Sequence, residues 1–255
     1  MAGHSHWAGI KHKKGAADKR RGKIFSKHAR AIMTAARLGG GDPEMNLRLK
    51  YAVDKARADN MPKDSIERAI KKGTGNLGAG ELLEEVQYEG FGPGGVAILV
   101  ESLTDNRNRT VPEIRRVFEK RGGSMGEAGS VAWMFEKKAL FVIPAASVDE
   151  DKLFEVAIEA GAQDVRLQGD SLEVVADPTE FAHMRGALAN AGIVPSRAEM
   201  TQMPKATVTL DAETGRQVLA LLEDLEEHED VQGTWSNFDI PESVMAELAE
   251  QEGRS

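Results

Sequence analysis

The first thirty residues contain the side chains best suited to chemistry with a polyanion. They hold nine Lys and Arg residues against one acid, Asp18, together with four of the six histidines and one of the three tryptophans. Residues 1–72 carry 18 basic and 7 acidic residues, a net charge of +11, whereas residues 73–255 carry 15 basic and 34 acidic residues, a net charge of −19. A basic head on an acidic chain is the electrostatic footprint of a protein that binds a polyanion.

The N-terminal tail carries its own candidate contacts. Residues 1–15 are basic, contain glycine and lack periodicity, so we expect a mobile arm. Trp7 has two interpretations that the sequence leaves open: it packs back on the helices that follow, or it stacks on a nucleobase. His4 and His6 are close enough in sequence to chelate, but a site without cysteine or a nearby carboxylate is poorly specified. We therefore expect no metal and no cofactor.

A helix predicted over residues 18–38 continues the basic charge. Phe25, Ile32 and Ala36 share one apolar face at helical spacing. The opposite face carries Lys19, Lys23, Lys27, Arg30 and Arg37. A basic arm beside a basic helix is a common way to hold a phosphodiester backbone.

Two further helices complete a small helical domain. Asp42 and Pro43 predict the start of the second helix, because Asp caps a helix N-terminus and Pro suits its first turn, and Met45 begins the apolar stripe. The third helix is predicted from about Pro62 to Gly73. Its outward side chains include Lys63, Lys71 and Lys72.

The glycine-rich segment 73–80 separates this helical domain from an α/β remainder. Residues 137–202 follow the order βαββαβ, which is the ferredoxin-like pattern. The segments 96–136 and 205–236 each read as βαβ, with strands predicted at Ser130–Phe135 and Thr207–Leu210. Joined, they make a second ferredoxin-like unit.

We therefore predict an α+β protein, in which a small N-terminal helical domain precedes two α/β (ferredoxin-like) domains, one inserted into the other. The predicted boundaries are 1–75 for the tail and helical domain, 81–136 with 203–240 for the discontinuous α/β domain, and 137–202 for the inserted α/β domain.

The segment Gly90–Gly95 satisfies G-x-G-x-x-G and follows a predicted strand, as a dinucleotide-binding turn would. A phosphate site needs a helix N-terminus directly after the glycines, whereas the apolar strand Val96–Val100 follows here. Pro93 also removes a backbone donor. We interpret the segment as a wide turn between strands.

The segment Thr104–Thr110, TDNRNRT, joins a core strand to a helix. Its Asp and Asn residues can cap the helix while the arginines form internal salt bridges, which is the favoured interpretation. Alternatively, Arg107 and Arg109 are forked donors that contact phosphate or carboxylate groups.

Residues 223–230 hold six acids in eight positions. They lack the spacing and central glycine of a calcium-binding EF-hand loop. We interpret them as a solvated helix end that repels nucleic acid and orients the basic head toward it.

Several classes of function are disfavoured. The chain has no cysteine, so disulfides and thiolate chemistry are impossible. Its longest bulky apolar run, Val96–Val100, is far shorter than the roughly 20 residues that span a bilayer. The N-terminus lacks the apolar stretch of a signal peptide, so we expect a cytoplasmic protein with no membrane contact. No catalytic motif argues for an enzyme, and no dimer stripe argues against a monomer.

The chain resembles the YebC family over essentially its whole length. The resemblance rests on MAGHSHW at residues 1–7, the run Lys11–Lys14, RGKIF at 21–25, LGGGDP at 38–43, NMPK at 60–63, YEGFGPGGV at 88–96 and TDNRNRT at 104–110. His6 stands where many members carry Lys. The resemblance implies a fold with a helical head and two α/β domains, and a regulator of gene expression that is not an enzyme.

The resemblance leaves the target open. Bacterial members are described as DNA-binding transcriptional regulators, a mitochondrial branch as a translational activator, and some bacterial relatives as ribosome-associated factors that help synthesis through proline-rich stretches. The absence of a clear recognition helix and the Gly/Lys/His tail favour structured RNA and the ribosome. The alternative is a transcriptional regulator bound to promoter DNA, and a third possibility is an adaptor that docks on an acidic protein.

On this basis we expect nucleic-acid contacts from the head, with TDNRNRT as a secondary contact. The expected contact residues are His4, Trp7, Lys11, His12, Lys13, Lys14, Lys19, Arg20, Arg21, Lys23, Lys27, Arg30, Arg37, Arg107 and Arg109.

Overall fold

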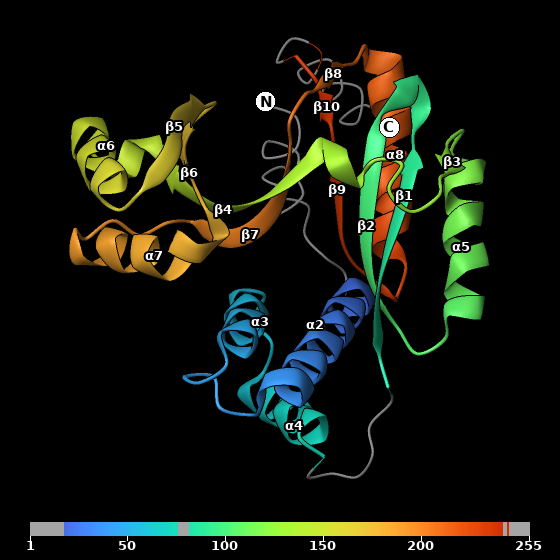
Figure 1. The fold of residues 1–255 in the computed structure, drawn as a ribbon, viewed down its shortest axis with the longest axis horizontal. Helices are drawn as coiled ribbons and strands as arrows, with labels where there is room; N and C mark the ends of the chain where they lie inside the picture. The colour runs from blue at the N-terminus through green and yellow to red at the C-terminus, as the bar shows by residue number, and fades with distance from the viewer. Residues whose placement is uncertain (1–17, 76–81, 242–243, 245–255) are drawn as a thin grey trace. The chain divides into compact units, whose positions relative to one another are not determined.

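The computed structural model describes residues 18–75, 82–241 and 244, with side chains from residue 21 onward (Figure 1). The described residues fall into two compact units. The first unit contains residues 18–131 and 213–234, and the second contains residues 132–212 and those from 235 onward. The fold is α+β, with an N-terminal three-helix region followed by two mixed α/β sheets.

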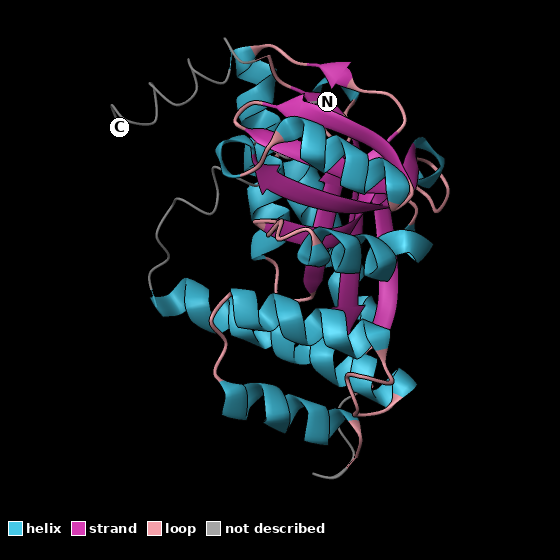
Figure 2. Ribbon diagram, turned by 90° about the vertical axis from the view of Figure 1, so that its left-hand side faces the viewer, coloured by secondary structure: helices cyan, strands magenta, loops and turns pink. Residues whose placement is uncertain are grey.

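The N-terminal head (residues 1–75) is described from residue 18 and contains α2 (Asp18–Gly39), α3 (Leu47–Ala58) and α4 (Lys63–Gly73). These helices form a layer without strands (Figure 2). Helix α2 packs against both α3 and α4. The shared core includes Ile32 and Leu49, both fully buried, and Ile66. The predicted helix over residues 18–38 and its apolar face are confirmed.

The predicted start of the second helix is wrong. Helix α3 begins at Leu47, and its N-cap is Asn46, whose side-chain oxygen accepts from the Leu49 N–H at 3.1 Å. The Asn46 amide nitrogen also donates to the carbonyls of Ala35 and Gly40, at 2.8 Å each. Asp42 instead caps the preceding turn. Met45, expected in the apolar stripe, is 84% exposed because it precedes the helix.

The first unit also holds a four-stranded sheet of order β3-β1-β2-β9. Its members are β1 (Glu84–Phe91), β2 (Ala97–Thr104), β3 (Ser124–Met125) and β9 (Val231–Ser236), with the helices α5 (Arg107–Lys120) and α8 (Ala212–Glu227). Strands β1 and β2 pair antiparallel along their whole length. The short helix η1 (Pro93–Gly95) joins them, and Gly94 and Gly95 have φ values of 72° and 74°. The predicted turn at the glycine-rich motif is therefore confirmed.

Two predicted strands do not join this sheet. Residues 130–135 form a bend and the short helix η2 (Ala132–Met134), and only Phe135 begins a strand. The buried Glu89 carboxylate accepts from the backbone N–H groups of Gly129 and Val131, both at 2.7 Å, so a side chain satisfies donors that a ladder would otherwise use. Strand β8 (Val208–Thr209) pairs with β10 (Phe238–Asp239) in a separate two-stranded sheet.

The second unit contains the predicted βαββαβ order. Its elements are β4 (Phe135–Pro144), η3 (Ala145–Ser147), α6 (Glu150–Glu159), β5 (Ala162–Gln168), β6 (Ser171–Ala176), η4 (Pro178–Glu180), α7 (Phe181–Asn190) and β7 (Arg197–Pro204). The sheet order is β5-β6-β4-β7, and all neighbours are antiparallel, as in a ferredoxin-like sheet. Helices α6 and α7 pack against each other, and Phe141 of β4 contacts Phe181 of α7 with ring centroids 4.9 Å apart.

Within the described ranges, no helix has the length and apolarity needed to cross a membrane.

Candidate nucleic-acid interface

The described residues cover only part of the expected contact surface. Residues 1–17 lie outside them, so the structure does not place the expected contacts His4, Trp7, Lys11, His12, Lys13 and Lys14. Lys19 and Arg20 lie in the first turns of α2, but their side chains are not described. The remaining candidates on α2 and α5 can be followed atom by atom.

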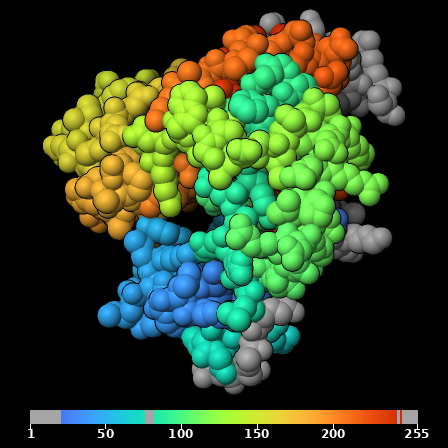
Figure 3. Space-filling model, turned by 45° about the vertical axis from the view of Figure 1, so that its right-hand side comes forward, coloured from blue at the N-terminus to red at the C-terminus, as the bar shows by residue number. Residues whose placement is uncertain are grey.

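The basic face of α2 divides into two parts. Arg21 and Lys23, in its N-terminal turns, are exposed. Lys27 and Arg30, one and two turns later, are half-buried, and both reach the region where α8 ends. Arg37 is half-buried near the C-terminal end of the helix. The head and residues 84–120 of the same unit form a continuous surface (Figure 3), and contacts of Arg30 with the Leu103 carbonyl and of Arg48 with Glu85 join them.

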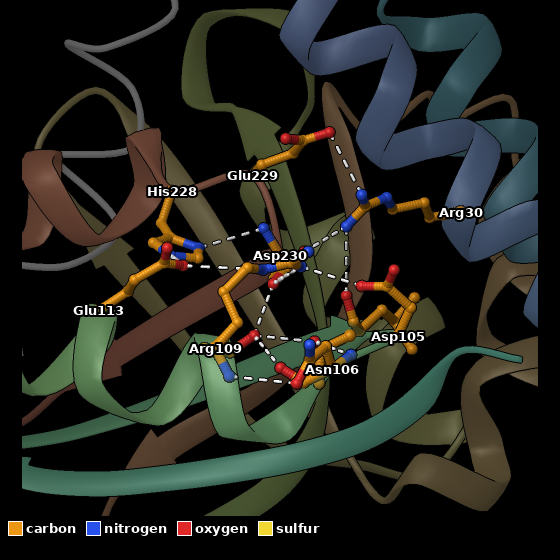
Figure 4. A network of polar contacts seen from close by, with 11 residues as sticks. Arg30, Asp105, Asn106, Arg109, Glu113, His228, Glu229 and Asp230 are labelled. Atoms are coloured by element: carbon orange, nitrogen blue, oxygen red, sulfur yellow. Dashed lines mark hydrogen bonds and ion pairs between the residues drawn. The ribbon is translucent and has the colours of Figure 1, made fainter. Parts of the chain in front are cut away.

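Lys27 and Arg30 direct their charges to the turn between α8 and β9. The Lys27 ammonium donates to the backbone carbonyl of Glu226. The Arg30 guanidinium donates to the carboxylate of Asp230 and, at 3.2 Å, to that of Glu229 (Figure 4). The Arg30 side chain is 14% exposed. In this arrangement its donors are used within the chain.

Asp230 is the centre of this network (Figure 4). Its carboxylate is buried and accepts from three side chains of two helices: Arg30 of α2, and the Arg109 guanidinium at 2.8 Å and the Thr110 hydroxyl at 2.6 Å, both of α5. The Asp230 carbonyl accepts from the Leu103 N–H at 2.8 Å, which ties the turn to β2. A buried carboxylate with this many donors is stable as an anion.

The protonation state of Asp230 follows from these contacts. Burial alone would raise its pKa, but the hydrogen bonds from Thr110, Arg109 and Arg30 outweigh it and lower the pKa of Asp230 to about 2. The same pairing raises the pKa of Arg109 above its usual value, since its hydrogen bond to Asp230 stabilises the guanidinium. Both groups are therefore charged at neutral pH.

The TDNRNRT segment is mostly used to build this centre. The Asn106 side chain caps α5 by accepting from the Arg109 N–H at 3.2 Å, and the Thr104 and Thr110 hydroxyls lie 2.7 Å apart. Arg109 also pairs with Asp105 at 2.9 Å. The favoured interpretation, capping with internal salt bridges, is confirmed for these residues. Arg107, the first residue of α5, is exposed.

The interpretation of residues 223–230 as a solvated helix end needs correction. Asp224 accepts from Arg121 at 2.8 Å and from Lys120 at 3.2 Å, and hydrogen bonding to Arg121 lowers the pKa of Asp224. His228 accepts from the Asp230 N–H through Nδ1, so its Nε2 carries the proton toward Glu113, 3.0 Å away. Several acids of this segment therefore bind cations of the same unit, because packing brings α2 and α5 to it.

The structure adds cations that the expected contact list lacks. Lys55 of α3 and Arg68, Lys71 and Lys72 of α4 are exposed and form no ion pair with a described residue, as is also true of Lys23. The sequence indicates the α4 cations, because the apolar stripe of α4 runs through Ile66 and Ala69 and leaves Arg68, Lys71 and Lys72 on the outer face. No group of His, Asp or Glu in the described part could hold a metal ion.

Both parts of the chain match models of one protein family. A model of the TACO1/YebC protein N-terminal domain matches residues 5–76, and a model of the TACO1/YebC second and third domain matches residues 83–238. A probable transcriptional regulatory protein of Geotalea uraniireducens is 54% identical over 248 residues, which cover 97% of this chain and all of that protein. A protein with the same name from Dictyoglomus turgidum is 51% identical over 250 residues, 98% of this chain and all of that protein.

A solved structure supports the fold. The crystal structure of the conserved hypothetical protein Aq1575 from Aquifex aeolicus superimposes with a TM-score of 0.82 at 48% identity. The match covers 92% of this chain and 97% of that chain.

Proposed function

Because the chain belongs to the TACO1/YebC family, we propose that it is a non-enzymatic regulator of gene expression that binds DNA and acts on transcription. The names of the relatives support this target, since both curated relatives described above are probable transcriptional regulatory proteins. Sequence reasoning favoured ribosomal RNA and a translation factor, but these names mention neither translation nor the ribosome. RNA therefore becomes the alternative target.

The observation that carries the proposal is a set of exposed cations on the head that form no ion pair with any described residue. They are Lys23, Lys55, Arg68, Lys71 and Lys72. A Lys or Arg side chain that forms no ion pair within the described part of the chain is available to neutralise a phosphate, and the cations condensed on the nucleic acid are released when it does so. Such contacts hold the backbone and position the protein without reading sequence.

The hydrogen-bond network around Asp230 limits which arginines and lysines are available to contact nucleic acid. Lys27, Arg30 and Arg109 have their donors engaged by Glu226, Glu229, Asp105 and Asp230, so we leave them out of the proposed contact surface. Arg107 stays as a secondary contact, because it is exposed at the start of α5. The network instead fixes α2 against α5 and the α8–β9 turn, which orients the exposed cations.

We further propose that the tail extends this surface. Its candidate contacts are His4, Trp7, Lys11, His12, Lys13 and Lys14, followed by Lys19, Arg20 and Arg21. Deleting residues 2–14 should remove most of the affinity for DNA. Thermal unfolding of the truncated protein should match that of the full chain, and a large loss of thermal stability would mean that Trp7 is a packing residue.

The decisive experiment is ultraviolet crosslinking in living cells, with sequencing of both the DNA and the RNA that the protein retains. Discrete promoter fragments, lost in a Lys71→Gln/Lys72→Gln variant, would support transcriptional regulation. Recovery concentrated in one region of ribosomal RNA would overturn the DNA target and restore the translation factor. Retention of neither nucleic acid would overturn the whole proposal and favour an adaptor for an acidic protein.

A further inference from the structure

Helix α5 carries a concentration of positive charge in the acidic part of the chain. Six of the fifteen Lys and Arg residues that follow residue 72 lie within residues 107–121, which hold only two acids. The helix packs beside β1 and β3 (Figure 1). A local excess of one charge serves either packing within the unit or binding to another molecule, so the partners of each cation decide between the two.

Part of this charge is used within the unit. Arg109 pairs with Asp230 at 2.8 Å. Lys120 and Arg121 both pair with Asp224, at 3.2 and 2.8 Å. Internal packing therefore accounts for these three cations.

Arg115 and Arg116 are used differently. Both side chains are exposed, and neither forms an ion pair with a described residue. A guanidinium presents a planar fork of donors that matches a carboxylate, and Arg is enriched in protein–protein interfaces. These two side chains are therefore available to an anionic group of another molecule.

Arg116 also lines an open cleft of about 680 Å³ between α5 and the C-terminal end of α8, in which Val117 supplies an apolar wall. Each acid that lines the cleft already has a partner within the chain; these acids are Glu113, Asp224, Glu227, Glu229 and Asp230. Among the described residues that line the cleft, Arg116 is the cation that forms no ion pair. The cleft thus offers an unused guanidinium next to apolar surface.

We propose that Arg115 and Arg116 form a docking site for an acidic segment of a partner protein, in which a carboxylate lies on the Arg116 guanidinium and an apolar side chain enters the cleft against Val117. The inference goes beyond the proposed function and does not depend on it, because the proposed nucleic-acid contacts lie on the head and Arg107.

Charge spacing favours a protein segment over a nucleic acid at this surface. Duplex DNA carries one negative charge per about 1.7 Å of its axis, so it requires a continuous basic surface. On α5 the acids Glu113 and Glu119 interrupt the basic residues, and both are exposed. A protein segment can place single carboxylates against the two arginines and leave the acids uncovered.

The test selects a phage-displayed library of random peptides on the full-length protein and measures the Kd of the enriched peptides with a fluorescent label. The enriched peptides should be rich in Asp and Glu. Arg115→Gln/Arg116→Gln should weaken their binding by about tenfold or more, because charge-assisted hydrogen bonds at the interface are lost. Arg116→Lys should keep only part of the affinity, since an ammonium lacks the fork. Glu119→Gln should strengthen binding, because it removes an exposed negative charge from the same helix.

The control is Lys71→Gln/Lys72→Gln, which removes two adjacent exposed charges from the head and should leave peptide affinity unchanged. Equal weakening in the two double variants would mean that the peptides respond to net charge alone, and would overturn the inference. Selection of peptides without an excess of acids, or wild-type affinity in Arg115→Gln/Arg116→Gln, would also overturn it. Loss of DNA binding in that variant, with peptide affinity unchanged, would assign this face of α5 to nucleic acid instead.

Discussion

Arg30 and Asp230 are 200 positions apart in the sequence, yet the Arg30 guanidinium donates directly to the buried Asp230 carboxylate (Figure 4). Arg109 and Thr110 share the same carboxylate. This contact joins the head to the sheet of its unit through charge rather than through an apolar interface alone. Arg30, which the sequence predicts as a phosphate contact, therefore already has an anionic partner within the protein.

Arg30 and Lys23 should therefore behave oppositely when each is changed to Gln. Arg30→Gln should lower the free energy of unfolding by about 1.5–3 kcal/mol, because a hydrogen bond between charged groups is lost and Asp230 stays buried. Lys23→Gln should leave stability within about 0.5 kcal/mol, since Lys23 is exposed and forms no ion pair with a described residue. Urea unfolding measures the first effect, and binding of a labelled duplex should weaken for Lys23→Gln. Equal stability of the two variants would contradict the structural role of Arg30.

Asp230 should make stability depend on pH in a defined acidic window. Its pKa is lowered from 3.8 to about 2 in the folded state, so its contribution is fully present above about pH 4 and is lost as pH falls through 2. The difference corresponds to about 2 kcal/mol. Urea unfolding between pH 2 and 6 should show that the wild-type protein is more stable than Asp230→Asn, and the difference between their free energies of unfolding should decrease toward pH 2. The exposed Asp64→Asn serves as the control, and a difference of constant size would contradict the assignment.

The elements that the sequence predicted well are those whose signals are local. The apolar face of α2 repeats every three to four residues, and the turn at Gly90–Gly95 follows from glycines and proline between two apolar runs. The βαββαβ order of residues 137–202 also comes from patterns within each element. Each of these is decided by neighbours in the chain.

The features that could not be predicted from the sequence depend on contacts between segments that are distant in the chain. Asp230 lies in an acid-rich run that looks solvated, and only the packing of α2 and α5 against it supplies its partners. The segment 130–135 has strand composition, but Glu89 accepts from the backbone N–H groups of Val131 and of the preceding Gly129. Asp42 and Asn46 both suit a helix cap, and the choice depends on the carbonyls of α2 that only Asn46 reaches.

Asp42 and Asn46, the two candidate caps of α3, should differ in how much they contribute to stability. Asn46→Ala should lower the free energy of unfolding by about 2–3 kcal/mol, because it removes the cap of α3 and the two side-chain hydrogen bonds from Asn46 to the Ala35 and Gly40 carbonyls. Asp42→Ala should cost about 0.5 kcal/mol, since it loses one exposed turn contact. Thermal unfolding of both variants gives the comparison. A larger loss for Asp42→Ala would mean that the cap assignment is wrong.

The outer face of α4 should determine how DNA binding responds to salt. Each phosphate contact on duplex DNA contributes a slope of about −0.9 in log K against log salt concentration. Lys71→Gln/Lys72→Gln should therefore make the slope shallower by about 1.8 and weaken binding similarly across different sequences. Both side chains are exposed, so stability should change by less than about 0.5 kcal/mol.

Arg115→Gln/Arg116→Gln is the matched control, because it also removes two adjacent exposed charges from a helix of the same unit, α5. If binding depends only on the net charge of the protein, the two double variants should lose affinity equally, and the assignment of the surface to the head would be wrong. If the contacts are local, the salt slope of the α5 variant should stay at the wild-type value while that of the α4 variant falls. A changed sequence preference in the α4 variant would mean that this face reads bases rather than phosphates.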